Sequence, residues 1–115
     1  KNIKALDYLG LNSGNKIPNK FEKSGLTAVK SEFVDAPLIA ELPLALECKF
    51  VSYNEESELM LAEIVNVSAD EKALDEKGNL LIEKLDVVCY DSASHGYYAL
   101  GSRVGNAFSD GKSIV

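Results

Sequence analysis

Two neighbouring runs in the middle of the chain constrain its fold more than any other feature. From Leu44 to Val51 the side chains alternate between two faces with a period of two, which predicts a β-strand. Leu59–Val67 reads as a second strand that is apolar on both faces except for Glu63 and Asn66. Because only the polar turn Tyr53–Ser57 lies between them, the two runs predict an antiparallel hairpin.

The residues before this hairpin predict short elements. Apolar residues at helical spacing predict a helix that already includes Lys1 and stops at Gly10, and Gly25 is well suited to end a short helix over Lys20–Ser24. Leu26–Phe33 predicts an edge strand, and Pro37 favours the start of a helical turn.

The residues after the hairpin predict further small elements. Asp70 can cap a short helix through Leu74. The tail from Gly101 holds three glycines and predicts a loop, with a short helix around Val104–Phe108 as the alternative. Two more strands are predicted at Val87–Tyr90 and Gly96–Leu100. Short strands joined by hairpins, with small helices between them, predict a β-rich α+β fold of the barrel or sandwich type.

Composition excludes several classes of protein. A chain of 115 residues is one domain or part of one, and its net charge of −6 argues against a nucleic-acid partner. No apolar run approaches the roughly 20 residues that a membrane span needs. Cys48 and Cys89 lie in apolar strand-like runs, so we expect free thiols buried in the core, with neither a disulfide framework nor a metal site.

Several blocks of the chain together resemble the flavin reductase-like, FMN-binding split-barrel family, in its flavoredoxin-like branch. The blocks are SGNKIPNKFEKSG (13–25), APLIAELPLALEC (36–48), LMLAEIVNVS (59–68), ALDEKG (73–78) and YYALGSRVGNAF (97–108). The resemblance implies a Greek-key split β-barrel of six strands. Family domains are longer, so residues 1–115 are expected to form a single partial domain, the C-terminal portion, with the N-terminal part of the barrel missing.

The loop before Lys20 is a candidate phosphate site. Asn12, Ser13 and Gly14 offer small side chains and backbone amides, which can cradle a phosphate while a lysine supplies charge. The residues alone leave open that Lys20 is a solvated surface lysine. The family resemblance implies that it reaches the flavin.

Tyr90, Tyr98 and Ser57 complete the predicted cofactor-binding set. A tyrosine ring can cover the isoalloxazine, and its phenol can form a hydrogen bond with the flavin edge. Tyr90 resembles an aromatic residue that often lies near the flavin in this family, and Ser57 stands where many members have a histidine. The alternative for both tyrosines is a place in the barrel core. No catalytic side chain is predicted.

The resemblance also implies a function for the intact parent protein. It would bind FMN, take a hydride from NADH or NADPH, and act as a flavin reductase or in flavoredoxin-type electron transfer. We expect a cytoplasmic homodimer with flavin, a nicotinamide nucleotide and a redox partner protein as its partners. Two alternatives stay open: an electron-carrier flavoprotein without direct NAD(P)H activity, and a non-catalytic fragment. Without further strands, the hairpin 44–67 is expected to expose an edge and apolar side chains, and to associate.

Overall fold

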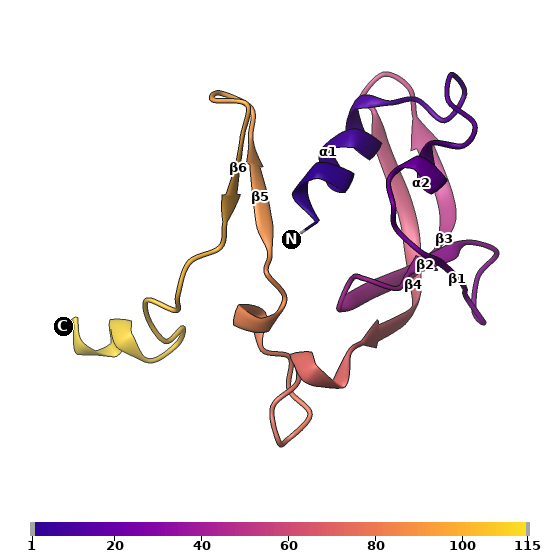
Figure 1. Ribbon diagram of the computed structural model, residues 1–115. Helices are drawn as coiled ribbons and strands as arrows, with labels where there is room; N and C mark the ends of the chain where they lie inside the picture. Colours follow the sequence, from indigo (N-terminus) through magenta and orange to yellow (C-terminus); the bar gives the residue numbers. More distant parts are fainter. Residues whose placement is uncertain (1, 115) are drawn as a thin grey trace. The chain divides into compact units, whose positions relative to one another are not determined.

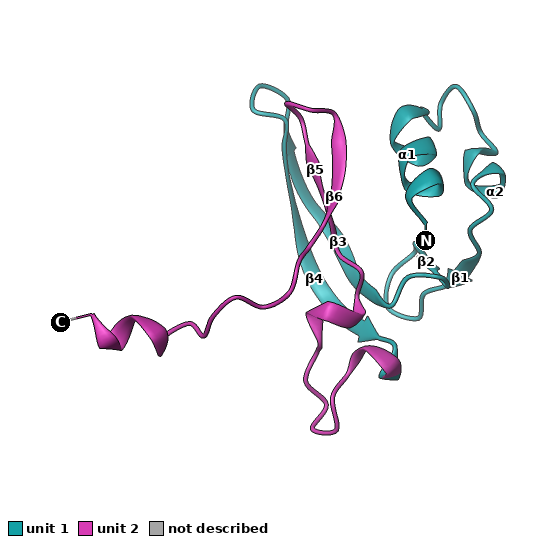
Figure 2. Ribbon diagram, turned by 60° about the vertical axis from the view of Figure 1, so that its left-hand side comes forward, with its two compact units in different colours: residues 1–71 teal, residues 72–115 magenta. Residues whose placement is uncertain are grey.

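A computed structural model describes residues 2–114. Within them the chain forms three separate two-stranded antiparallel sheets, two α-helices and three short 3₁₀ helices (Figure 1). The chain divides into two compact units, residues 1–71 and 72–115, coloured separately in Figure 2. The β-rich α+β class is therefore confirmed. The sheets are not closed, which is consistent with part of a barrel.

The first unit opens with two helices joined by a loop. Helix α1 spans Ile3–Leu11 and helix α2 spans Lys20–Lys23. The predicted stop at Gly10 is wrong by one residue, because the chain turns extended only at Asn12. Lys1, which was predicted to lie inside this helix, is outside the described residues. The predicted end of the second helix is confirmed, since Gly25 has the left-handed φ of 74° that favours glycine.

Strands β3 (Leu44–Asn54) and β4 (Leu59–Ala69) form the predicted antiparallel hairpin. The register shifts twice along it, once between Glu47 and Cys48 and once between Phe50 and Ser52. Each shift places one extra residue in one strand, so the simple alternation between two faces does not hold along the whole hairpin.

A second, smaller hairpin joins β1 (Ala28–Lys30) to β2 (Pro37–Ile39). The predicted edge strand is confirmed in a shorter form. The helical turn predicted at Pro37 is wrong, because Pro37 begins β2 and faces Lys30. Proline is tolerated at the first residue of a strand, where its missing N–H costs no ladder hydrogen bond.

The second unit contains a third hairpin, β5 (Val88–Asp91) and β6 (Gly96–Ala99), at the predicted positions. The 3₁₀ helices are η1 (Glu71–Ala73), which begins at the end of the first unit, η2 (Ile82–Lys84) and η3 (Asp110–Ser113). The loop predicted from Gly101 is confirmed as far as Asn106, and the alternative, a helix over Val104–Phe108, does not form. Phe108 has a left-handed φ of 61°, which a right-handed helix cannot contain.

Among the described residues the apolar core is very small. Ala73 is the one buried hydrophobic residue, whereas Phe50 is 67% exposed and Leu61 62% exposed on the β3–β4 hairpin. The expectation of uncovered apolar side chains on this hairpin is confirmed. The predicted burial of Cys48 and Cys89 is wrong: both thiols are free, but both are exposed, because each lies in a hairpin of two strands.

Candidate functional site

The Lys20 ammonium group is held against the end of helix α1. Its Nζ donates hydrogen bonds to the backbone oxygens of Leu9, at 3.0 Å, and Asn12, at 2.7 Å. A lysine in this position satisfies carbonyl groups that a helix end leaves unpaired and complements the helix dipole. Since an ammonium has three protons, one remains for another acceptor. Lys20 is therefore a partly buried structural residue with one donor to spare.

The predicted loop residues lie beside this lysine. A Cβ built on Gly14 would meet Lys20 Cε at 3.9 Å, an ordinary contact distance. Ser13 organises the turn: its carbonyl accepts from the amides of Lys16 and Ile17, and its hydroxyl accepts from the amide of Asn15. The structure thus brings Asn12, Ser13, Gly14 and Lys20 together in one place.

Three consecutive amides of this loop have no acceptor within residues 2–114. They belong to Asn12, Ser13 and Gly14, which donate no backbone hydrogen bond there. Consecutive free N–H groups next to a lysine are the donor set that suits an anionic group. The loop therefore fits a phosphate chemically.

Ser57 lies in the turn between β3 and β4. Its amide and its hydroxyl both donate to Asn54 Oδ1, at 2.9 and 3.0 Å. This pairing shapes the turn, and it uses the only proton of the Ser57 hydroxyl. Ser57 is left with only its oxygen lone pairs to offer a ligand.

The two predicted tyrosines lie on opposite faces of the β5–β6 hairpin. Tyr90 is the cross-strand partner of Tyr97, and their rings pack 5.5 Å apart between centroids with a 53° tilt. Tyr98 pairs with Cys89 and so lies on the other face. One flat ring placed against one face of this hairpin can contact Tyr90 or Tyr98 directly, but not both.

The predicted residues are divided between the two units. Residues 1–71 contain Asn12, Ser13, Gly14, Lys20 and Ser57, and residues 72–115 contain Tyr90 and Tyr98. Within the first unit, the loop and Lys20 form a local cluster.

Sequence reasoning missed a buried polar network in the first unit. Glu47 is 3% exposed and Ser31 4% exposed, and the two are hydrogen-bonded to each other. The Glu47 carboxylate also accepts from the Asn66 amide, its cross-strand partner. Ser31 in turn accepts from the amides of Phe33 and Val34, both at 3.0 Å. The network ties the loop after β1 to the β3–β4 hairpin.

A signal for this network was present in the sequence. Glu47 and Asn66 are polar residues in two mainly apolar strands, as Lys49 and Glu63 also are, and the hairpin register sets Glu47 opposite Asn66. Ser31 could not be found in this way, because its contact with Glu47 spans two hairpins.

The network makes Glu47 a stable carboxylate. Hydrogen bonds from Asn66 and then from Ser31 lower the pKa of Glu47, although burial opposes this. A carboxyl group with a lowered folded-state pKa stabilises the fold above its unfolded pKa, and this contribution is lost as pH falls through the folded value.

We expect Glu47→Gln to reduce the loss of unfolding free energy that occurs as the pH is lowered. Wild type should lose stability as pH falls below about 4.3, the usual glutamate pKa, and the variant should lose less over that window. Urea unfolding at a series of pH values measures the stability of wild type and of the variant. Glu56→Gln, in the exposed β3–β4 turn, is the matched control and should follow wild type. Parallel curves for wild type and Glu47→Gln would contradict the assignment.

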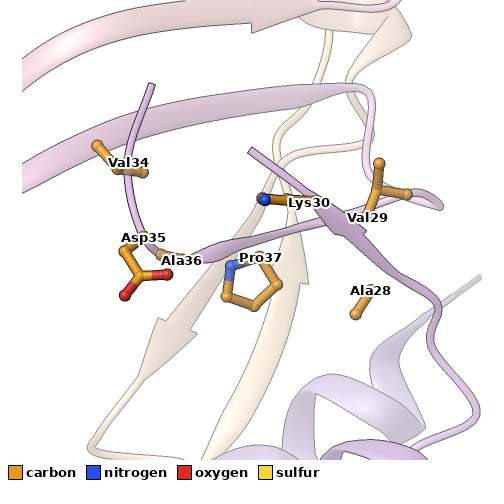
Figure 3. Close-up of a pocket in the computed structure, with 7 residues that line it drawn as sticks. All are labelled: Ala28, Val29, Lys30, Val34, Asp35, Ala36 and Pro37. Atoms are coloured by element: carbon orange, nitrogen blue, oxygen red, sulfur yellow. The ribbon is translucent and has the colours of Figure 1, made fainter. Parts of the chain in front are cut away.

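A pocket of about 380 Å³ lies next to this network, between β1, β2 and the loop that joins them. Figure 3 shows the Pro37 ring among the lining residues, with Val34 and Asp35 on one side and Ala28 and Val29 on the other. Lys30 and Ala36 complete the lining. None of the predicted flavin residues lines this pocket.

Two other kinds of site are absent from residues 2–114. No cluster of three or more His, Cys, Asp or Glu side chains there could hold a metal ion. No helix in that part of the chain has the length and apolar character needed to cross a membrane.

Comparison with known proteins indicates which class of protein the chain is similar to. No family model matches the chain. Its structure, however, superimposes on proteins of the flavin reductase-like split-barrel class, which confirms the resemblance seen in the sequence blocks. The chain accounts for only about 54–60% of the length of four of these proteins, so it corresponds to part of such a protein.

Two flavoredoxins are similar in both sequence and structure. Flavoredoxin of Desulfovibrio vulgaris (Miyazaki F) is 38% identical, with a TM-score of 0.86 over 95% of this chain and 58% of that one. Flavoredoxin from Methanosarcina acetivorans is 30% identical, with a TM-score of 0.84 over 98% of this chain and 60% of that one.

Two further similarities are weaker, one in sequence identity and one in the length matched. The FMN-binding domain of a flavin reductases-like enzyme from Shewanella baltica OS155 has a TM-score of 0.77 over 91% of this chain and 58% of that one, but at 19% identity it shows the fold alone. An uncharacterized protein of Aquifex aeolicus (strain VF5) is 35% identical over 77 residues, which are 63% of this chain and 39% of that protein.

Proposed function

We propose that the protein containing this chain is an FMN-binding flavoprotein that transfers electrons, either as an NAD(P)H-dependent flavin reductase or in the manner of a flavoredoxin. The observation that carries the proposal is the 38% identity to a flavoredoxin across 95% of the chain. Because the chain spans less than two thirds of the flavoredoxins it matches, the activity of the whole protein is part of the proposal.

The loop 12–14 and Lys20 would hold the phosphate of FMN. Three amides and one ammonium proton there have no acceptor within residues 2–114, and all carry positive or partly positive charge. Tyr90 or Tyr98 would cover or edge the flavin ring. The bound flavin supplies the redox chemistry, whereas this chain supplies binding and orientation.

The electron donor and the assembly belong to the same proposal. NADH or NADPH would reduce the flavin, and a redox partner protein would receive the electrons. We propose a homodimer, since the exposed apolar side chains of the β3–β4 hairpin need cover in a stable protein. A cytoplasmic location is part of the same proposal. The second candidate function is an electron carrier that does not react with NAD(P)H, which the flavoredoxin similarity equally favours.

The absorption spectrum of the purified full-length protein tests the proposal. We expect the visible bands of bound oxidised flavin, and their bleaching under anaerobic conditions when NADH or NADPH is added. A flavin that dithionite bleaches but neither nucleotide reduces would favour the carrier. A protein that stays colourless and takes up no added FMN would contradict both functions and favour the non-catalytic alternative.

A further inference from the structure

The phenol of Tyr98 is held at a defined place by the turn that precedes its strand. Tyr98 Oη lies 3.1 Å from the hydroxyl of Ser94, four residues earlier in the chain. The residue is 55% exposed, so a ligand can reach it. The first question is which of the two hydroxyls donates.

Asp91 decides the direction of this hydrogen bond. Its carboxylate accepts from the Ser94 hydroxyl and the Ser94 amide, and also from the Ala93 amide at 3.1 Å. These bonds, the Ser94 hydroxyl first, lower the pKa of Asp91. An ionised carboxylate can only accept. The single hydroxyl proton of Ser94 is therefore spent on Asp91.

Tyr98 must then be the donor to Ser94. A phenol has one proton and can also accept. With the proton directed at Ser94, only the lone pairs of the Tyr98 oxygen remain for another group. Because of the hydrogen bonds from Tyr98 to Ser94 and from Ser94 to Asp91, the exposed side of the Tyr98 oxygen can only accept a hydrogen bond.

Gly96 leaves the space that this arrangement needs. A Cβ added there would lie 3.0 Å from Tyr98 Cε2 and 3.1 Å from Ser94 Oγ, closer than ordinary contacts. His95, which lies between Ser94 and the start of β6, has a left-handed φ of 51°. Turn geometry and the missing side chain therefore fix the Tyr98 ring against Ser94.

We propose that Asp91 and Ser94 are positioning residues that present the Tyr98 oxygen as a hydrogen-bond acceptor to an N–H or O–H donor of the bound flavin. Such donors are the N3–H of the isoalloxazine ring and the hydroxyls of the ribityl chain. The inference rests on the proposed function for its ligand, whereas the hydrogen-bond chain itself exists in the protein without flavin.

The first experiment tests the hydrogen-bond chain in flavin-free protein. Tyrosine labelled with ¹³C at Cζ gives one NMR signal per ring, and Tyr98→Phe identifies the signal of Tyr98. We expect Ser94→Ala and Gly96→Ala each to shift that signal, and Ser92→Ala, an exposed control in the same turn, to leave it in place. An unmoved Tyr98 signal in both Ser94→Ala and Gly96→Ala would overturn the proposal.

The second experiment tests the role in binding, with FMN as the probe and fluorescence quenching as the readout. We expect Tyr98→Phe and Ser94→Ala each to weaken binding by about two- to tenfold, the range of one neutral hydrogen bond. The double variant should bind no more weakly than Tyr98→Phe alone, because Ser94 acts through Tyr98. Independent effects that multiply in the double variant would overturn the positioning role.

FMN methylated at N3 shows whether the N3–H or a ribityl hydroxyl donates the hydrogen bond to Tyr98. If wild type binds this analogue more weakly than FMN, and Tyr98→Phe does not discriminate, the partner is the N3–H. If neither protein discriminates while the double-variant result holds, the partner is a ribityl hydroxyl. A wild-type protein that binds no FMN at all would refute the proposed function and the ligand role of Tyr98, while the NMR result would still decide whether the hydrogen-bond chain exists.

Discussion

Ser31→Ala is expected to lower the free energy of unfolding by about 1–3 kcal/mol, the usual cost of leaving buried polar groups without partners. Ser31 is 4% exposed and has three hydrogen-bond partners at once. Alanine removes a donor from the buried Glu47 carboxylate and an acceptor from the amides of Phe33 and Val34. Water cannot easily replace these bonds, because Glu47 is 3% exposed.

Urea unfolding of the purified protein measures this effect. The midpoint should fall while the slope of the transition stays the same, since the surface exposed on unfolding changes little. Ser52→Ala is the matched control: it removes an exposed hydroxyl from β3 and should change stability by less than about 0.5 kcal/mol. Equal midpoints for Ser31→Ala and Ser52→Ala would show that the network does not stabilise the fold.

This network also marks the limit of what could be read from the sequence. The β3–β4 hairpin was predictable because period-two alternation and a polar turn are local features. The two register shifts were not, because a bulge depends on how one strand meets the other. The contact between Ser31 and Glu47 joins residues sixteen positions apart and on different hairpins, which no local pattern encodes.

Local rules failed where two of them competed. Pro37 is compatible with the first turn of a helix and with the first residue of a strand, and pairing with Lys30 decided for the strand. At Phe108 a left-handed φ of 61° excludes the short helix that was the alternative to a loop over Val104–Phe108. Neither outcome follows from the preferences of single residues.

The candidate site was partly predictable. The cluster of Asn12, Gly14 and Lys20 follows from nearness in sequence, and the structure shows it. The use of Lys20 at the end of α1 was missed, because its contact with Leu9 joins residues eleven positions apart. The opposite placement of Tyr90 and Tyr98 follows from pleat and register, which became known only with the β5–β6 pairing.

Lys20→Met is expected to weaken FMN binding by about ten- to a hundredfold in the full-length protein, because a hydrogen bond to a charged group contributes about 1.5–3 kcal/mol. Methionine keeps much of the bulk of lysine but removes its charge and all three donors. The same change frees the carbonyls of Leu9 and Asn12, so α1 should also lose stability. Affinity and stability must therefore be measured separately, by fluorescence titration of FMN and by thermal unfolding without FMN.

Lys16→Met is the matched control, since Lys16 lies in the same loop with an exposed side chain. It should lower FMN affinity only slightly, through the long-range loss of one screened charge. If Lys20→Met lowers stability but binds FMN as tightly as Lys16→Met does, Lys20 serves only to close the end of α1. A selective loss of affinity would instead assign its third proton to the flavin phosphate, because Leu9 and Asn12 already use the other two.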